Sequence, residues 1–158
     1  MISKILAPTD LSGLSASGIK YAYNLARDVG AELLIVHVVQ VAEIMHAVRE
    51  LQDKPSAHWD QAGSIEERLV DRHKHLLDEF VKKQLGEIVS NVKVRLDVVV
   101  GQPYATVIER AKTEKVDLIV MSTHGRSGIP RMMLGSVTEK VLRSSHCPVL
   151  AIPIYNEN

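Results

Sequence analysis

Three glycines and several hydroxyl side chains lie between residues 122 and 136, where together they could hold an anion. The stretch begins Ser122-Thr123-His124-Gly125-Arg126-Ser127-Gly128 and ends Gly135-Ser136. Glycine lets a backbone approach a ligand closely, and free N–H groups in a loop or in the first turn of a helix favour negative charge. The alternative is structural, because Ser136-Val137-Thr138-Glu139 has the pattern of a helix capping box. These residues alone leave the phosphate-binding and capping interpretations balanced.

A carboxylate follows the first apolar run of the chain. The segment Pro8-Thr9-Asp10-Leu11-Ser12 comes directly after Lys4-Ile5-Leu6-Ala7. Asp10 could accept hydrogen bonds from ribose hydroxyls or hold a metal ion, and the structural alternative is a helix cap shared with Ser12. The late glycine loop lacks the Gly-Lys-Ser/Thr of a P-loop, and no Gly-x-Gly-x-x-Gly follows the first strand. Neither of those two common phosphate-binding motifs therefore explains the pattern.

The elements that must position these groups alternate between short apolar runs and amphipathic stretches. Continuous apolar runs are typical of strands buried on both faces, and three- to four-residue spacing is typical of helices. Their alternation predicts a parallel sheet covered by helices on both faces, with ligands bound outside the carboxyl ends of the strands. We expect strands at 4–7, 32–39, 92–100, 117–121 and 148–154, and helices at 18–29, 64–89, 103–114 and 137–144.

Residues 41–63 show no sustained periodicity, and we expect this segment to be partly helical and partly mobile. The helix after it starts with a capping box at Ser64-Ile65-Glu66-Glu67. Gly30 is expected to end the first helix, and Pro103 to open the third, because proline suits a first helical turn.

The composition is that of a soluble globular protein of ordinary size. The chain has 158 residues, of which 46% are hydrophobic and 24% charged, and we expect 1–158 to form a single domain. Lysine plus arginine equals aspartate plus glutamate at 19 each, so we do not expect nucleic acid as a partner. The single cysteine suits a reducing compartment. The apolar runs are too short to cross a bilayer and the first residues lack a signal-peptide pattern, which predicts a cytoplasmic protein with no membrane partner.

The seven histidines do not form a metal-binding pattern. His37 falls inside a predicted strand, where a buried and hydrogen-bonded histidine is the expected state. His73 and His75 are two residues apart on a predicted helix, so they do not face each other. We expect no dedicated metal site.

Several segments together resemble the universal stress protein family, in its nucleotide-binding branch, over essentially the whole chain. The heaviest evidence is Met121 to Gly128 with Leu134-Gly135-Ser136-Val137-Thr138-Glu139-Lys140-Val141; the accompanying segments are Ala7 to Ser12, His37-Val38-Val39, Val100-Gly101-Gln102-Pro103 and Cys147-Pro148-Val149-Leu150. The ATP-binding branch carries glycine, two residues, glycine, nine residues, glycine and then serine or threonine. Gly125, Gly135 and Ser136 match this motif, whereas Ser122 replaces its first glycine. Binding would weaken if that position needs a positive φ or a bare backbone, and would survive if it needs only a small residue, which we favour.

The resemblance implies an open five-stranded parallel sheet with helices on both faces, of the Rossmann-like, adenine-nucleotide α-hydrolase-like type. It implies ATP, ADP or AMP as the ligand, with Mg²⁺ or Mn²⁺ held by the nucleotide phosphates. Asp10 would meet the ribose, and the backbone of Val38 would pair with adenine. The site residues that the resemblance implies are Pro8, Thr9, Asp10, Val38, Ser122, Thr123, His124, Gly125, Arg126, Ser127, Gly128, Gly135, Ser136, Val137 and Thr138.

The resemblance further implies a regulatory or signalling module of the stress response, and we assign no catalytic residue. No carboxylate–histidine pair is placed for general-base catalysis. The alternatives are a slow ATPase and a nucleotide-independent dimer that binds partner proteins. Members of the family pair their last strand across a two-fold axis, which implies a homodimer through residues 148–154; the apolar character of that strand fits a covered edge.

Overall fold

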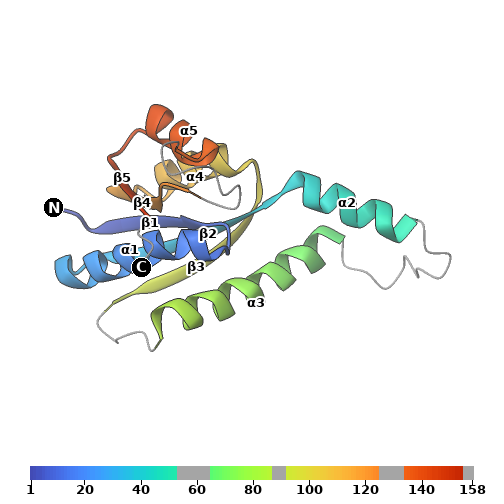
Figure 1. Ribbon diagram of the computed structural model, residues 1–158, viewed down its shortest axis with the longest axis horizontal. Helices are drawn as coiled ribbons and strands as arrows, with labels where there is room; N and C mark the ends of the chain where they lie inside the picture. Colours follow the sequence, from blue (N-terminus) through green and yellow to red (C-terminus); the bar gives the residue numbers. More distant parts are fainter. Residues whose placement is uncertain (53–64, 87–91, 125–133, 155–158) are drawn as a thin grey trace.

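The computed structural model describes residues 1–52, 65–86, 92–124 and 134–154. The chain forms five strands and five α-helices within those ranges, with one short 3-10 helix, η1 (Figure 1). Their bounds in chain order are β1 Lys4–Thr9, η1 Gly13–Ser15, α1 Ala16–Val29, β2 Glu32–Gln40, α2 Val41–Gln52, α3 Ile65–Leu85, β3 Val94–Gly101, α4 Pro103–Thr113, β4 Leu118–Ser122, α5 Ser136–Ser144 and β5 Val149–Ile152.

The five strands form one parallel sheet in the order β3-β2-β1-β4-β5. The chain starts in the middle of the sheet, moves outward to β3, and returns to the other side of β1 with β4. The strand order therefore reverses between β1 and β4, which is where open sheets of this kind bind their ligands. The predicted five-stranded parallel α/β fold is confirmed.

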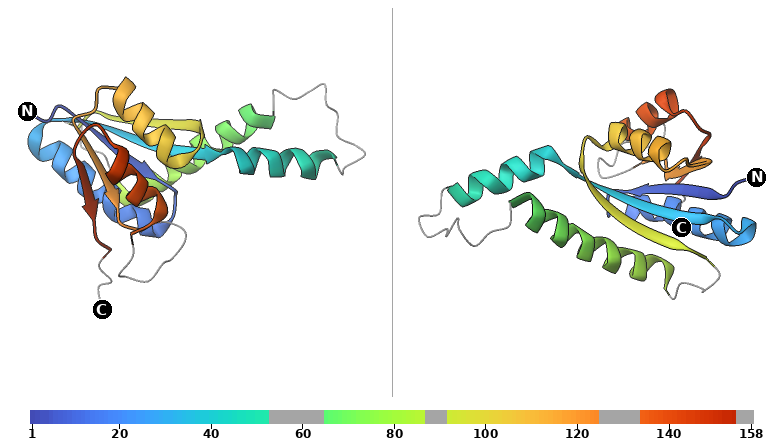
Figure 2. Two further views of the ribbon diagram at one scale, coloured as in Figure 1. Left: turned by 90° about the horizontal axis from the view of Figure 1, so that it is seen from above. Right: turned by 180° about the vertical axis from the view of Figure 1, so that it is seen from behind.

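Alternating side chains of the strands feed two hydrophobic layers, one on each face of the sheet. Ile5, Ala7, Leu33 and Ile35 pack with α1 and α3 on one face. Their neighbours along the same strands point the other way: Leu6, Leu34 and Val36 pack, with Ile119 of β4, against α4 and α5. Figure 2 shows the two pairs of helices on opposite sides of the sheet.

The segment that lacked a clear pattern begins with a regular helix. Strand β2 runs directly into α2, and α2 with the adjacent end of α3 extends beyond the carboxyl end of the sheet (Figure 1). Helix α2 therefore lies beside the strand ends rather than over the sheet. Residues 53–63, which complete the segment expected to be partly mobile, lie outside the described residues.

Two predicted boundaries are wrong, and each has a physical reason. The first strand does not stop at Ala7 but includes Pro8 and Thr9. The Lys4 carbonyl accepts from the Asp117 N–H on the β4 side of the strand. Because backbone groups alternate sides along a strand, those of Pro8 also point to the β4 side. Pro8 lies beyond the last β1–β4 pair, Leu6↔Ile119. Its missing N–H therefore costs no sheet hydrogen bond.

The second wrong boundary is the end of α3, which stops at Leu85 rather than near residue 89. Gly86 adopts a left-handed φ of 66°, the usual way to terminate a helix. Each other expected end lies within two residues of the observed one; the last strand, expected at 148–154, is β5 Val149–Ile152. Gly30 caps α1 with a φ of 70°, and Pro103 opens α4.

Charged side chains join the elements at the opposite, amino end of the sheet. Glu114 accepts two hydrogen bonds from Arg95, at 3.1 Å each, and one from Lys4 at 3.3 Å. The hydrogen bonds from Arg95, then from Lys4, lower the pKa of Glu114 to about 2. This network links β1, β3 and α4 on the side of the sheet away from the strand ends considered below.

Candidate functional site

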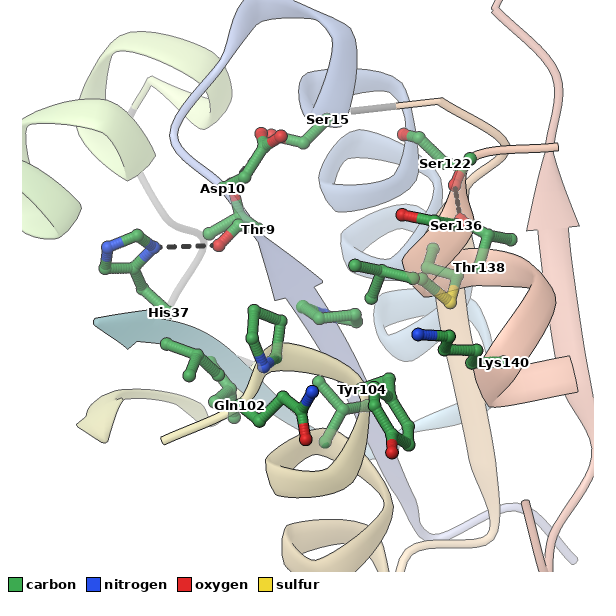
Figure 3. Close-up of a pocket in the computed structure, with 18 of the residues that line it drawn as sticks. Thr9, Asp10, Ser15, His37, Gln102, Tyr104, Ser122, Ser136, Thr138 and Lys140 are labelled. Carbon is green, nitrogen blue, oxygen red and sulfur yellow. Dashed lines mark hydrogen bonds between the residues drawn. The ribbon is translucent and has the colours of Figure 1, made fainter. Parts of the chain in front are cut away.

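A cavity of about 390 Å³ opens at the carboxyl ends of the strands. It is bounded by the ends of β1, β2 and β4 and by the first turns of α4 and α5 (Figure 3). The residues that line it are Pro8, Thr9, Asp10, Ser15, Val36, His37, Val38, Gln40, Gln102, Pro103, Tyr104, Val107, Met121, Ser122, His124, Gly135, Ser136, Val137, Thr138 and Lys140.

The cavity exists because β1 and β4 separate before they end. Their register contains Ile5↔Leu118 and Leu6↔Ile119, whereas β1 continues to Thr9 and β4 to Ser122. The space between the two diverging strand ends is the opening at the reversal of strand order.

The turn after β1 is held by its own hydroxyl and carboxylate groups. Thr9 is buried, and its Oγ1 accepts from the Leu11 N–H at 3.0 Å and lies 2.7 Å from Ser15 Oγ. Asp10 Oδ1 accepts from the Ser12 N–H at 3.0 Å and from the Ser12 hydroxyl, which is an Asx turn rather than a cap of the long helix. Leu11 adopts a left-handed φ of 63°. These contacts hold Asp10 at the cavity edge.

The end of β2 presents a backbone carbonyl to the cavity. The β1–β2 register stops at Thr9↔His37, but β2 continues to Gln40. The Glu32 N–H donates to Ser3 on the β1 side, and the Leu33 N–H donates to Lys93 on the β3 side. By alternation, the N–H and C=O of Val38 point to the β1 side. The register places the Val38 N–H opposite the Thr9 carbonyl, as the Glu32 N–H lies opposite the Ser3 carbonyl, and leaves the Val38 C=O beyond the last β1 residue. The C=O of Val38 therefore faces the cavity.

Ser122 joins β4 to the first turn of α1. Its Oγ accepts from the Gly18 N–H at 2.9 Å and lies 2.9 Å from Ser17 Oγ. Its carbonyl accepts from the Thr138 hydroxyl at 3.0 Å (Figure 3). The described non-glycine residues with positive φ are Leu11 and Lys115. Ser122 is not among them, so its backbone conformation does not require glycine here.

The first turn of α5 lies across the cavity from β2. The helix is preceded by Gly135, which is the N-cap in an extended conformation and makes no side-chain capping bond. The capping-box interpretation of Ser136 is therefore wrong, because Ser136 is already the first helical residue. The Glu139 N–H makes the first intrahelical bond, to Gly135 O at 2.9 Å. The N–H groups of residues 136–138 consequently have no acceptor within the helix.

Thr123 and His124 begin the long loop between β4 and α5. The Thr123 N–H donates to Ile152 O of β5 at 2.9 Å, and its carbonyl accepts from the Gly135 N–H at 2.8 Å. His124 Nδ1 lies 2.9 Å from Thr123 Oγ1, and its buried Nε2 has no hydrogen-bond partner among the described residues. The predicted site residues Gly125, Arg126, Ser127 and Gly128 lie outside the described part of the chain.

Ten of the cavity-lining residues are not among the predicted site residues: Ser15, Val36, His37, Gln40, Gln102, Pro103, Tyr104, Val107, Met121 and Lys140. Gln40 and Gln102 lie within two residues of predicted strand ends, and that position was a signal that could have found them. Lys140 lies four residues after Ser136 and so on the same face of α5. Its Nζ sits 4.8 Å from the centre of the Tyr104 ring, a contact between α4 and α5 that only the folded chain reveals.

The described residues contain neither a metal-binding cluster nor a membrane-spanning helix. No group of three or more histidine, cysteine, aspartate or glutamate side chains is arranged to hold a metal ion in that part of the chain. Among the described helices, none combines the length and apolar character that crossing a membrane requires.

Known proteins resemble this chain in both sequence and structure. The model of the universal stress protein family matches residues 1–153. Universal stress protein MJ0531 of Methanocaldococcus jannaschii is 35% identical over 152 residues, which cover 96% of this chain and 82% of that protein. The solved structure of MJ0577, from the same organism, is 29% identical with a TM-score of 0.71 and covers 99% of both chains.

A universal stress protein solved in complex with cAMP has the same fold, with a TM-score of 0.66 at 22% identity over 96% of this chain and 97% of that one. The match of the family model spans nearly every residue of the chain, including each strand that borders the cavity. This chain belongs to the universal stress protein family.

Proposed function

We propose that this chain binds an adenine nucleotide (ATP, ADP or AMP) in the cavity and acts as a regulatory or signalling module in the stress response. The observation that carries the proposal is that backbone groups face the cavity from two opposite sides. Val38 offers a C=O at the end of β2, and the first turn of α5 offers N–H groups that have no acceptor within the helix. The first suits the edge of a base, and the second suits phosphate.

The base would lie between β1 and β2. The amino group on a purine edge, such as that of adenine, can donate to the Val38 carbonyl. Pro8, Val38 and Met121 supply apolar surface there, as ligand pockets typically do around a few fixed polar groups.

The ribose and phosphates would extend from Asp10 toward α5. A carboxylate accepts from vicinal hydroxyls, and Asp10 is held at the cavity edge by Ser12. Ser136 adds a hydroxyl to the N–H groups of the first turn of α5. Among the described residues that line the cavity, Lys140 is the single lysine and none is an arginine. Lys140 has no carboxylate partner in the described part of the chain. Mg²⁺ or Mn²⁺ would be held by the phosphates of a bound triphosphate.

The fold supports the proposal as well, because one universal stress protein with this architecture was solved in complex with cAMP. That protein is only 22% identical, so its ligand guides the choice of nucleotides to test. Titration calorimetry of the full chain with ATP, AMP, adenosine and GTP tests the site directly. We expect adenine compounds to bind more tightly than GTP and affinity to rise with the number of phosphates; no binding at millimolar ATP would reject the proposal.

We further propose that two copies pair through residues 148–154 and that the protein acts in the cytoplasm. Strand β5 is an edge of the sheet. The Pro148 carbonyl accepts from Ile119 of β4, and the Ile152 carbonyl accepts from Thr123, just after β4. By alternation, the backbone groups of Ala151 face away from the sheet. Proline is tolerated on an edge strand where the lost N–H faces outward. Ala151→Pro should therefore yield a monomer in sedimentation velocity experiments while the wild-type chain sediments as a dimer; a wild-type monomer at micromolar concentration would contradict this pairing.

A further inference from the structure

A series of polar contacts runs behind the cavity and reaches a cavity-lining residue at each end. The Gln40 N–H donates to Glu43 Oε1 at 3.3 Å, and Glu43 Oε2 lies 3.6 Å from His73 Nε2. His73 Nδ1 lies 2.8 Å from His37 Nε2, and His37 Nδ1 lies 2.9 Å from Thr9 O (Figure 3). Gln40 and Thr9 both line the cavity. The contacts therefore tie α2 and α3 to the two strand ends that form one wall of the site.

Both histidines in this series of contacts are buried, which confirms the expectation for His37. The exposed fractions of His37 and His73 are 1% and 8%, and their ring planes differ by 7°. On α3, the residues one turn before and after His73 are apolar: Leu69, Val70, Leu76 and Leu77. The Glu43 side chain is 32% exposed, so protons enter this series of contacts at Glu43.

Hydrogen-bond chemistry fixes where the protons lie. The Thr9 carbonyl can only accept, so His37 Nδ1 carries the proton that it donates. Neutral His37 then has a lone pair at Nε2, which requires His73 Nδ1 to donate. His73 Nε2 is the remaining position. When it is protonated it donates toward the Glu43 carboxylate, and when it is not, a lone pair faces that negative charge.

Two titratable groups that contact His73 directly are His37 on β2 and Glu43 on α2. The elements packed around His73 carry further titratable side chains: Tyr23 on α1, Asp10 after β1, His46, Arg49 and Glu50 on α2, and, within two turns of His73 on α3, Glu66, Glu67, Arg68, Asp71, Arg72, Lys74, His75, Asp78 and Glu79. Glu43 is the carboxylate that lies 3.6 Å from His73 Nε2, and this contact depends on the His73 proton.

We propose that His73, through His37 and Glu43, is a positioning residue that makes the affinity of the cavity for adenine nucleotide depend on pH. The inference rests on the proposed function. Protonated His73 closes the contacts from Gln40 to Thr9, and hydrogen bonds in such a series strengthen one another. Loss of the Nε2 proton turns the contact with Glu43 into a repulsion and loosens the wall. Affinity is therefore higher below the pH at which His73 titrates and falls as the pH rises through it.

The substitution that separates this inference from a merely structural role is Glu43→Gln. A glutamine can accept from the Gln40 N–H with its carbonyl and donate to unprotonated His73 Nε2 with its amide. The affinity of the Glu43→Gln variant for ligand should therefore stay high at every pH. Glu43→Ala leaves the contacts open, and its affinity should stay low at every pH.

The measurement is the dissociation constant of adenosine, which has no phosphate to titrate, from about pH 5.5 to 8.5, the range in which histidines change charge. We expect the wild-type affinity to fall about tenfold over this range, which by linkage corresponds to a shift of one pKa unit at His73 between the free and bound protein. Glu43→Gln should show no such change. Matched controls are His75→Gln and His46→Gln, which remove exposed histidines of α3 and α2 and should keep the wild-type pH profile.

The possible outcomes have separate meanings. Binding with the same pH profile in the wild type and in Glu43→Gln would overturn the inference. No adenosine or ATP binding at any pH would reject the nucleotide site itself. ¹⁵N NMR of the imidazoles follows the protonation of His73 in the absence of ligand. His73 should titrate at lower pH in Glu43→Gln than in the wild type, and an unchanged midpoint would overturn the inference.

Discussion

The Gly18 N–H donates to Ser122 Oγ at 2.9 Å, so the end of β4 supplies an acceptor for the first turn of α1. The approach is close enough that a Cβ on Gly18 would come 2.7 Å from the Ser122 backbone nitrogen. The first turn of α1, the end of β4 and, through Thr138, the start of α5 are therefore packed around one residue of the cavity wall.

Gly18→Ala should destabilise the fold by about 1–3 kcal/mol, because backbone atoms rather than a flexible side chain must move to admit the methyl group. Urea unfolding at neutral pH measures the change. The control is Gly13→Ala, whose Cβ would have no heavy atom within 4 Å. Equal stability of the two variants would show that the helix and strand are not in close contact.

Ser122→Gly restores the glycine of the family motif and tests whether that position limits binding. Ser122 does not have a positive φ, so we expect affinity for ATP to change by less than about threefold, against the tenfold that 1.4 kcal/mol would produce. Stability should fall by about 1–2 kcal/mol, because the buried Gly18 N–H loses its acceptor. Ser122→Ala removes only the hydroxyl. A tenfold gain in ATP affinity in the glycine variant alone would show that a bare backbone is needed.

Ser136→Pro tests whether the first turn of α5 binds phosphate. Proline suits the first helical position, and Gly135 with φ −60° and ψ 146° has the backbone conformation that precedes proline. The variant should keep its helix but lose an N–H and a hydroxyl, whereas Ser136→Ala loses only the hydroxyl. We expect ATP affinity to fall in the order wild type, alanine, proline, with about tenfold between the ends. Adenosine affinity should not change, and a parallel loss for adenosine would argue against phosphate at this turn.

The acid stability of the chain should depend on Glu114. The folded pKa of Glu114 is about 2, lowered from an ordinary value of 4.5 chiefly by hydrogen bonds from Arg95 and Lys4. A lowered carboxyl pKa stabilises the fold fully above pH 4.5, and this stabilisation is lost as the pH falls toward 2. Because the pair is partly solvated, we expect about 1–2 kcal/mol. Glu114→Gln should flatten this part of the profile of unfolding free energy against pH; a profile identical to that of the wild type would exclude the network as its source.

The sheet and its ligand edge could be predicted from sequence because the strands are continuous apolar runs followed by short polar turns. Asp10, Val38 and Ser122 could be placed at one edge on that basis alone, since parallel strands share their carboxyl ends. The orientation of the Val38 backbone required the register with β1. Lys140 and Tyr104 required the packing of α4 on α5, which no local pattern encodes.

The errors have a common origin in choices between equivalent local signals. Pro8 looked like a strand end because a proline usually interrupts the hydrogen bonds of a sheet. In the fold, the β1–β4 pairing on that side has already ended at Leu6. Ser136 looked like a cap because a glycine and a serine stand side by side, and the hydrogen bond from Gly135 N–H to Thr123 O selects the glycine. Both were decided by tertiary contacts.

The parting of β1 from β4 also bears on how the chain folds. The pairing of Leu6 with Ile119 closes a very long loop, and few backbone pairs hold β1 and β4 together. The pairing therefore offsets the entropy lost on closing the loop only when the surrounding hydrophobic layers are complete. A molecule in the cavity contacts both strands, so it binds only to molecules of the protein in which β1 and β4 have paired. Occupancy of the site and completion of the sheet are thus one coupled equilibrium, and a cell rich in ligand would hold more of this protein folded.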